Sequence, residues 1–204
     1  MFALFVLVAS THFAALLSPG PDFFLLIRAA LLKGRQQADG CAAGIALANL
    51  LSMLLVLLAL GLLSAQGGWL WPALQVAGGA YFIWLGGQAL CSQRRLELTA
   101  VEPQACAGTW VDGLREGLLA SCLNPKLPIF YAGLFGVLRE AAMPSWGMLL
   151  SMLWMTLVVL IWDLALVRLL GQARWRGWLQ RRVVWLDRLC GGFLLVLGVW
   201  LVCA

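Results

Sequence analysis

The sequence predicts an all-α integral membrane protein, with six transmembrane helices arranged as an inverted three-plus-three repeat in which helices 1 and 4 are broken. Its 204 residues are 63% apolar and 11% charged, whereas soluble domains carry about 25% charged residues. No charged residue occurs between Asp39 and Arg94, a run long enough for two spans of about 20 residues each. Prolines interrupt two of the apolar segments where an ordinary span would continue. These observations exclude a soluble domain and indicate a multi-pass membrane protein.

Six apolar segments account for the predicted spans. The second and third lie in the uncharged run and are separated by an Ala-Gln-Gly-Gly turn at residues 65–68. The sixth is the shortest, because only about 16 residues follow Arg188. The first has no basic segment before it and no small-residue cleavage site after it, so a cleaved signal peptide is not expected. The spans are predicted at residues 2–27, 41–64, 69–90, 117–138, 146–167 and 186–203.

The two halves of the chain resemble each other weakly. Gly79 and Gly86 in the third predicted span have the same spacing as Gly191 and Gly198 in the sixth. A half with three spans begins and ends on opposite sides of the membrane, so the second half is inverted relative to the first. A chance match between two glycine-rich spans is the alternative. The predicted organisation is one transmembrane domain over residues 1–204, with repeats at about 1–95 and about 112–204 and a linker at about 96–111.

Basic residues are distributed unevenly between the two sides of the predicted bundle. Twelve of the 14 lie beside the connections that follow the first, third and fifth spans, and the positive-inside rule places these connections in the cytoplasm. Both chain ends are therefore expected outside the cytoplasm. The net charge of +5 is explained by this topology and by attraction to anionic lipid, so the lipid bilayer is an expected partner and nucleic acid is not. The twelve residues are Arg28, Lys33, Arg35, Arg94, Arg95, Arg115, Arg168, Arg174, Arg176, Arg181, Arg182 and Arg188.

The connection before the sixth span has a mixed composition. Residues 172–187 combine arginine with tryptophan and leucine. This mixture is typical of an amphipathic helix that lies on a lipid surface. We therefore predict a surface helix on the cytoplasmic side, with an anchoring role.

The first break consists of Pro19, Gly20, Pro21 and Asp22. Proline lacks an amide hydrogen and disfavours helical geometry in the residue before it, so the helix is expected to stop near Leu17 and to restart at residues 21–23. The amides and carbonyls that the break leaves unpaired can bind ionic groups. The alternative is a structural kink, with Asp22 serving as a helix N-terminal charge near the membrane surface.

The second break consists of Asn124, Pro125 and Lys126. A lysine near the middle of a span costs about 2.5–3.5 kcal/mol, so Lys126 requires a partner. If the halves are pseudo-symmetric, the two breaks face each other and Asp22 is that partner. Asp163 in the fifth span, or the carboxylate of a bound substrate, is an alternative, and so is a purely structural ion pair.

Three further polar residues lie in the apolar segments. His12 is close enough to the first break to relay a proton, or it packs as a satisfied core residue. Asn49 either lines a pathway or forms a hydrogen bond between helices. Asp163 either takes part in transport or pairs with Arg168 near the cytoplasmic interface. The single histidine and six cysteines without C-x-x-C spacing predict neither a metal site nor a cofactor.

At the motifs Pro19-Gly20-Pro21-Asp22 and Asn124-Pro125-Lys126, the chain resembles the bacterial LysE/RhtB-type family of amino-acid exporters. The resemblance covers essentially the whole chain. It implies a transporter and not an enzyme, which exports amino acids or close derivatives across the bacterial inner membrane, by exchange with protons, through a duplicated three-helix unit. Members of the family vary between Asp and Asn at the position of Asp22, and His12 and Asp163 match no motif of the family. Whether the chain forms a homo-oligomer is left open.

Three alternatives belong to other classes of protein. The first is a transmembrane thiol-redox protein of the cytochrome-biogenesis type, because Cys122 lies two residues before Asn124; Ser18, however, stands where a second redox cysteine would be needed. The second is divalent-metal efflux, which the lack of His and acidic clusters disfavours. The third is a structural bundle, which leaves the energetic costs of Asp22 and Lys126 unexplained.

Overall fold

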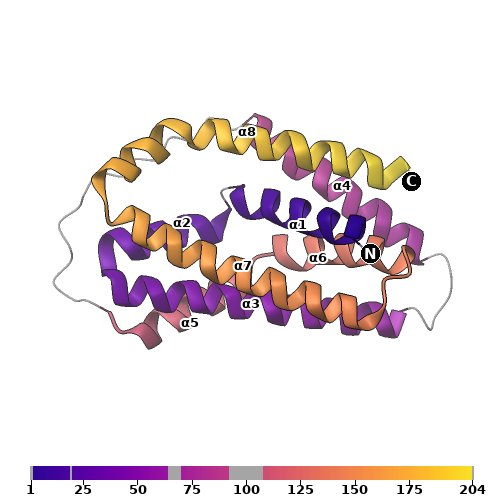
Figure 1. The fold of residues 1–204 in the computed structure, drawn as a ribbon, viewed down its shortest axis with the longest axis horizontal. Coiled ribbons are helices and arrows are strands. Elements are labelled where there is room, and N and C mark those ends of the chain that lie inside the picture. The colour runs from indigo at the N-terminus through magenta and orange to yellow at the C-terminus, as the bar shows by residue number, and fades with distance from the viewer. Residues whose placement is uncertain (1, 19, 64–69, 92–107, 204) are drawn as a thin grey trace.

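The computed structural model describes residues 2–18, 20–63, 70–91 and 108–203. Within these ranges the chain is helical and contains no strand, and the helices lie roughly along one long axis (Figure 1). Pro19 lies outside the described residues. The elements are α1 (Phe2–Leu17), α2 (Pro21–Arg28), the π-helix η1 (Ala29–Lys33), α3 (Arg35–Leu63), α4 (Leu70–Leu90), α5 (Trp110–Cys122), α6 (Lys126–Glu140), α7 (Ser145–Leu170) and α8 (Ala173–Cys203).

The two predicted helix breaks are confirmed. α1 ends at Leu17 and α2 begins at Pro21, with a bend of 54° between the two segments. α5 ends at Cys122 and α6 begins at Lys126, with a bend of 61°. Pro21 is the first residue of α2, and Pro125 directly precedes the first residue of α6. A missing amide hydrogen costs least at these positions, because the first amides of a helix have no partner within it.

The number of spans agrees only in part with the prediction. Three helical segments of the described chain are long and apolar enough to cross a membrane, namely Arg35–Leu62, Ser145–Leu170 and Gln180–Trp200. Five spans result when each bent pair is counted as one. α4, with 21 residues, coincides with the third predicted span but is not among these five. The exact count of six therefore stays a prediction.

Two boundaries differ from the sequence prediction. The first span continues beyond residue 27 through η1, and α3 begins at Arg35 and not at residue 41. A span predicted from hydropathy ends at the first charged residues, whereas a helix continues until its backbone hydrogen bonds are interrupted. Here Gly34 makes that interruption, with φ at 86°, a value that glycine adopts without steric cost.

Residues 173–187, predicted as part of a helix on the lipid surface, form the first half of α8, a continuous helix of 31 residues. They are helical as predicted, but no break separates them from the sixth span. No proline lies between residues 173 and 203, so nothing in the local sequence stops the helix. The sixth span is consequently not short, since its apolar segment Gln180–Trp200 has 21 residues.

Glycines bring α3 and α5 into close backbone contact. A Cβ added at Gly44 would lie 2.6 Å from the amide nitrogen of Leu118, and one at Gly117 would overlap the carbonyl group of Cys41. Gly40 and Gly113 make equivalent contacts one turn earlier. The two helices therefore run parallel, and the pairs of glycines four residues apart form the small-residue interface that is common between membrane helices.

Two glycine contacts also join α4 and α8, which run antiparallel. A Cβ added at Gly86 would lie 2.6 Å from the carbonyl oxygen of Gly191, and one at Gly198 would lie 2.6 Å from the carbonyl oxygen of Gly79. These are the four glycines whose spacing matches in the two halves of the sequence. The two contacts are equivalent by symmetry: Gly86 and Gly198 occupy corresponding positions in the two helices, and so do Gly191 and Gly79.

Replacing Gly44 by alanine is expected to destabilise the protein. The added methyl group would overlap backbone atoms of α5, which cannot rotate away, and such overpacking costs about 1–3 kcal/mol. Gly61 lies on the same helix, but a Cβ there would meet no atom within 4 Å. Gly61→Ala should therefore keep or slightly raise the free energy of unfolding, because alanine favours helix by about 0.5–1 kcal/mol. Unfolding in detergent measures both, and equal midpoints would contradict the proposed interface.

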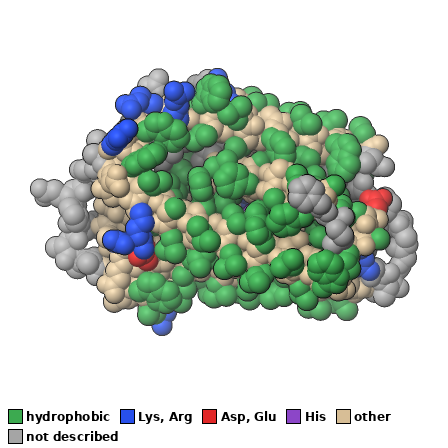
Figure 2. Space-filling model, in the orientation of Figure 1, with side chains coloured by type: hydrophobic (Ala, Val, Ile, Leu, Met, Phe, Trp, Pro, Cys, Tyr) green, Lys and Arg blue, Asp and Glu red, His purple; other side chains and the backbone are tan. Residues whose placement is uncertain are grey.

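The surface separates an apolar middle from a basic end. Figure 2 shows hydrophobic side chains over most of one face, with Lys and Arg gathered at the left. Exposed apolar side chains occur on three long helices, as expected for a surface in contact with lipid. The described chain ends lie at the opposite end from the basic residues (Figure 1). Examples of these side chains are Leu51, Leu54, Leu55 and Leu58 on α3, Leu149, Leu153 and Ile161 on α7, and Leu189, Val196 and Trp200 on α8.

Two ion pairs join helices at the basic end. Lys33 of η1 pairs with Glu116 of α5 at 2.9 Å, and Arg168 of α7 pairs with Asp39 of α3. Gln37 also donates a hydrogen bond to Glu116, at 3.0 Å. Lys33 and Glu116 are about one-quarter exposed, so they are partly screened and contribute modestly to stability.

Candidate functional site

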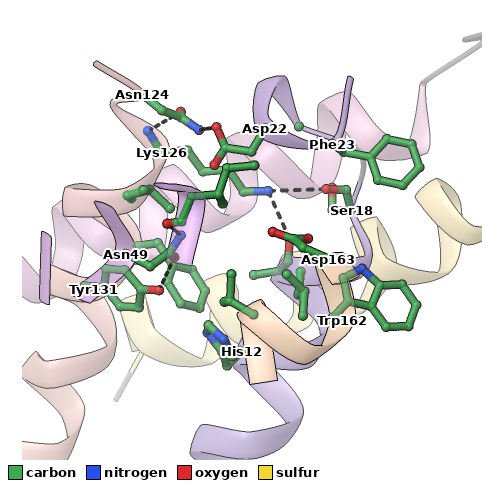
Figure 3. A pocket seen from close by; sticks show the side chains of 17 residues that line it. His12, Ser18, Asp22, Phe23, Asn49, Asn124, Lys126, Tyr131, Trp162 and Asp163 are labelled. Carbon is green, nitrogen blue, oxygen red and sulfur yellow. Dashed lines mark hydrogen bonds between the residues drawn. The ribbon is translucent and has the colours of Figure 1, made fainter. Parts of the chain in front are cut away.

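The two helix breaks face each other in the interior of the bundle (Figure 3). The side-chain amide of Asn124 donates a hydrogen bond to Asp22, with 3.3 Å between nitrogen and oxygen. The side-chain oxygen of Asn124 accepts a hydrogen bond of 3.1 Å from the backbone amide of Lys126. Asn124 thus caps the start of α6 and at the same time holds the carboxylate of the other break. The expectation that the breaks face each other is confirmed.

Lys126 reaches across to the end of α1. Its ammonium group donates hydrogen bonds to the backbone carbonyls of Ala15, at 3.1 Å, and Ser18, at 3.5 Å. Carbonyls at a helix C-terminus lack intrahelical partners and carry the negative end of the helix dipole. The sequence analysis considered only carboxylates as partners for this lysine. The break itself supplies partners, while the charge of Asp22 also attracts Lys126.

A cavity opens between the two breaks, with an empty volume of about 600 Å³ that includes space open to solvent. Its walls come from α1, α2, α3, α6 and α7, together with the break residues between these helices. Most of its lining is apolar, with a few polar groups converging on it, as is usual for small-molecule sites. Seven residues singled out in the sequence line this cavity: His12, Gly20, Asp22, Asn49, Asn124, Lys126 and Asp163.

Asp163 lies on the wall formed by α7. Its side chain is only 6% exposed, and one carboxylate oxygen forms no hydrogen bond with the described part of the chain. Arg168 pairs with Asp39, so the alternative in which Asp163 pairs with Arg168 is not found. Five residues, or about 1.4 turns of helix, separate Asp163 from Arg168, so their side chains point about 140° apart around the helix. Asp163 therefore faces the cavity, where it is close enough to Asp22 for the two carboxylates to interact electrostatically.

Asn49 and Tyr131 form a buried polar contact on another wall. The hydroxyl of Tyr131 donates a hydrogen bond of 2.6 Å to the side-chain oxygen of Asn49, whose amide donates to the carbonyl of Ile45 at 2.9 Å. The expected hydrogen bond between helices is therefore present, and Asn49 also lines the cavity. The sequence analysis missed Tyr131. A tyrosine in an apolar span is a usable signal, since a buried phenol needs a hydrogen-bond partner.

His12 is 3% exposed and packs among aromatic rings. Its ring lies 6.2 Å, between centroids, from those of Phe130, Tyr131 and Trp154. Neither ring nitrogen forms a hydrogen bond of standard geometry within the described ranges, although the ring lies beside the backbone of Met155. His12 is thus both a packed residue and part of the cavity lining.

Pro21 and Pro125, the described prolines of the two breaks, line a second cavity with an empty volume of about 720 Å³. Residues of α4 also line this cavity. It shares Gly20 and Lys126 with the first cavity. The predicted site residues therefore all lie around the same two breaks, except Pro19, which is outside the described residues.

The other chemical classes find little support in this geometry. Among the residues that the structure describes, no group of three or more His, Cys, Asp or Glu side chains is placed to hold a metal ion. Cys122 is exposed and lines neither cavity. No cysteine that the structure describes lines either cavity, so the thiol-redox alternative gains no support from these residues.

The chain resembles known efflux proteins along nearly its whole length. It is 29% identical to the threonine efflux protein of Escherichia coli K12 and to that of Salmonella typhi, over 99% of this chain and 98% of each relative. It is 26% identical to the leucine efflux protein of Klebsiella pneumoniae, over 71% of this chain and 68% of that protein. No solved structure matches it. The family model of LysE type translocators matches residues 13–204, and the chain therefore belongs to the LysE translocator family.

Proposed function

We propose that this chain is a secondary transporter that exports amino acids or close derivatives from the cytoplasm across the inner membrane, in exchange for protons. The observation that carries the proposal is the first cavity, in which Lys126 and Asp22 of the two breaks lie together with Asp163 of α7. Ionisable groups at such depth are costly and mark substrate or ion pathways. The family and the threonine and leucine efflux relatives support an amino-acid substrate.

The cavity offers complementary groups for both ends of a zwitterion. Lys126 binds the carboxylate of the amino acid. Asp163 and the carbonyls of Ala15 and Ser18 receive its ammonium group, which takes the place that the ammonium of Lys126 holds in the structure. The apolar lining, which includes Phe130, accommodates an uncharged side chain and disfavours a charged one.

The charges in the cavity support coupling to protons. One ammonium group and two carboxylates, Asp22 and Asp163, leave an excess negative charge where solvation is poor. A zwitterion brings no net charge and cannot correct this excess. A proton on one carboxylate corrects it, so binding and release of a proton accompany the transport cycle.

The proposal includes an inverted repeat and an orientation in the membrane, which the glycine contacts and the distribution of basic residues support. The two symmetric glycine contacts between α4 and α8 are those expected when a pseudo-two-fold axis in the membrane plane relates the halves. The basic end of the bundle faces the cytoplasm by the positive-inside rule. Both described chain ends lie at the opposite end (Figure 1), and so outside the cytoplasm.

Overproduction of the protein in a bacterium is expected to give selective resistance to growth-inhibiting amino acids and their analogues. Threonine and leucine are tested first, because the relatives export them. Accumulation of the same amino acid in the medium is the direct measurement, with an empty vector as the control. Membrane insertion of the protein, with no resistance and no accumulation for any proteinogenic amino acid, would contradict the proposal.

A further inference from the structure

The second cavity lies on the other side of Lys126 from the first. Four residues of the breaks line both cavities, namely Ser18, Gly20, Asn124 and Lys126. The first cavity continues towards α3 and α7, whereas the second continues towards α4. The two spaces are therefore neighbours, and the residues of the breaks form the wall between them.

Gly20 lies beside the side chain of Lys126 in this wall. A Cβ added at Gly20 would lie 3.4 Å from the ammonium nitrogen of Lys126 and 3.8 Å from its Cδ. The backbone of Gly20, with φ at −96°, is open to any residue, so its conformation does not require glycine. The missing side chain instead leaves space beside Lys126, and the lysine is a flexible chain that separates the two cavities.

α4 supplies groups that suit an amino acid. The rings of Tyr81 and Trp84 are stacked, with 5.6 Å between centroids and 28° between planes. Aromatic faces attract ammonium groups. Gln88, one turn after Trp84, adds an amide that donates to a carboxylate. All three residues line the second cavity, with Lys126 opposite them.

The position of Gln88 indicates where this cavity opens. Gln88 is exposed and lies two residues before the end of α4. A polar amide is tolerated at the level of the membrane interface and is costly at the centre. The connection that follows α4 carries Arg94 and Arg95, which the positive-inside rule places in the cytoplasm.

We propose that the second cavity is a separate binding site for a zwitterionic amino acid, through which the substrate enters from the cytoplasm. Tyr81, Trp84 and Gln88 hold the amino acid there, and Lys126 hands its carboxylate on to the first cavity. The amino acid occupies this entry site before it reaches Asp163. This inference rests on the proposed export function.

Protection of a cysteine from a thiol reagent tests the entry site. All six native cysteines are replaced, Leu85→Cys is introduced, and inverted membrane vesicles are treated with a charged methanethiosulfonate reagent at their exposed cytoplasmic face. Leu85 lines the cavity but supplies none of the groups that hold the amino acid. L-threonine or L-leucine should slow the labelling about tenfold when its free concentration is ten times its dissociation constant, because about nine-tenths of the sites are then occupied. Ala89→Cys, at another lining residue, replaces Leu85→Cys if the latter fails to insert.

The chain offers a matched control in Cys91. This native cysteine is exposed, lies three residues beyond Gln88 and does not line the cavity. A protein that keeps only Cys91 should be labelled at the same rate with and without the amino acid. Equal labelling of Leu85→Cys with and without amino acid, in vesicles that still exchange it, would overturn the entry site and leave export standing. Vesicles of the wild-type protein that exchange no amino acid would overturn the proposed function, and the entry site with it.

Discussion

Replacing Lys126 by methionine is expected to reduce amino-acid export at least about thirtyfold and to leave the protein folded in the membrane. Lys126 is the cation shared by the two cavities, and its ammonium is held by carbonyls of the opposite break. Losing one partner of a buried charge contact costs about 2–5 kcal/mol, and 1.4 kcal/mol corresponds to about tenfold. Insertion should not suffer, because a lysine in mid-membrane costs about 2.5–3.5 kcal/mol that methionine does not.

Export from cells and exchange in proteoliposomes measure this effect, with the amount of inserted protein determined in parallel. Arg115→Met is the matched control, since Arg115 is exposed on α5 and lines neither cavity. It removes the same charge and should leave export unchanged. If Lys126→Met exports as well as the wild-type protein, Lys126 is a structural residue and the proposed site is wrong.

Replacing Asp22 by asparagine is expected to abolish the response of exchange to a pH gradient. The asparagine oxygen still accepts the hydrogen bond from Asn124, so the breaks stay joined, but the side chain can no longer bind and release a proton. With one proton exchanged per amino acid, a gradient of one pH unit supports accumulation of up to about tenfold in the wild-type protein. Asp22→Asn should lose this accumulation and keep the exchange of labelled for unlabelled amino acid.

Asp163→Asn is the informative companion variant. Asp163 is more deeply buried than Asp22 and has an oxygen without a hydrogen bond inside the described ranges, and it binds the ammonium of the substrate in the proposed cycle. Its loss should weaken substrate binding and retain the response to pH. The reverse result, with pH dependence kept in Asp22→Asn and lost in Asp163→Asn, would transfer the proton to Asp163. Glu140→Gln, at the exposed end of α6, serves as the control carboxylate.

Local chemistry explains which parts of the fold were predictable. The end of α1 and the start of α6 follow from proline, which removes a hydrogen-bond donor wherever it stands, and the apolar spans follow from the cost of charge in lipid. The start of α3 and the continuity of α8 were not predicted correctly. In both places charged residues continue a helix beyond the apolar segment. Water at the membrane surface solvates these charges, and no proline interrupts the backbone hydrogen bonds of the helix there.

The site was predictable in its composition and not in its contacts. The two breaks, Asp163, Asn49 and His12 were each recognisable as polar interruptions of apolar spans. The attachment of Lys126 to carbonyls of α1, the hydrogen bond from Tyr131 and the second cavity were not recognisable. They depend on how helices cross, and glycine contacts that bring backbones together set those crossings.

The sequence by itself determined that the chain is a helical membrane protein, where two of its spans break, and which ionisable residues interrupt its apolar segments. These properties depend on the free energy of transferring each residue into lipid and on the backbone geometry of proline. Both are local, so the sequence is sufficient to predict them. Only the tertiary structure decided that Arg168 pairs with Asp39, that Asp163 faces the cavity, and that Lys126 lies between two spaces. Those outcomes are distances between helices far apart in the chain, and the packing of the whole bundle determines such distances.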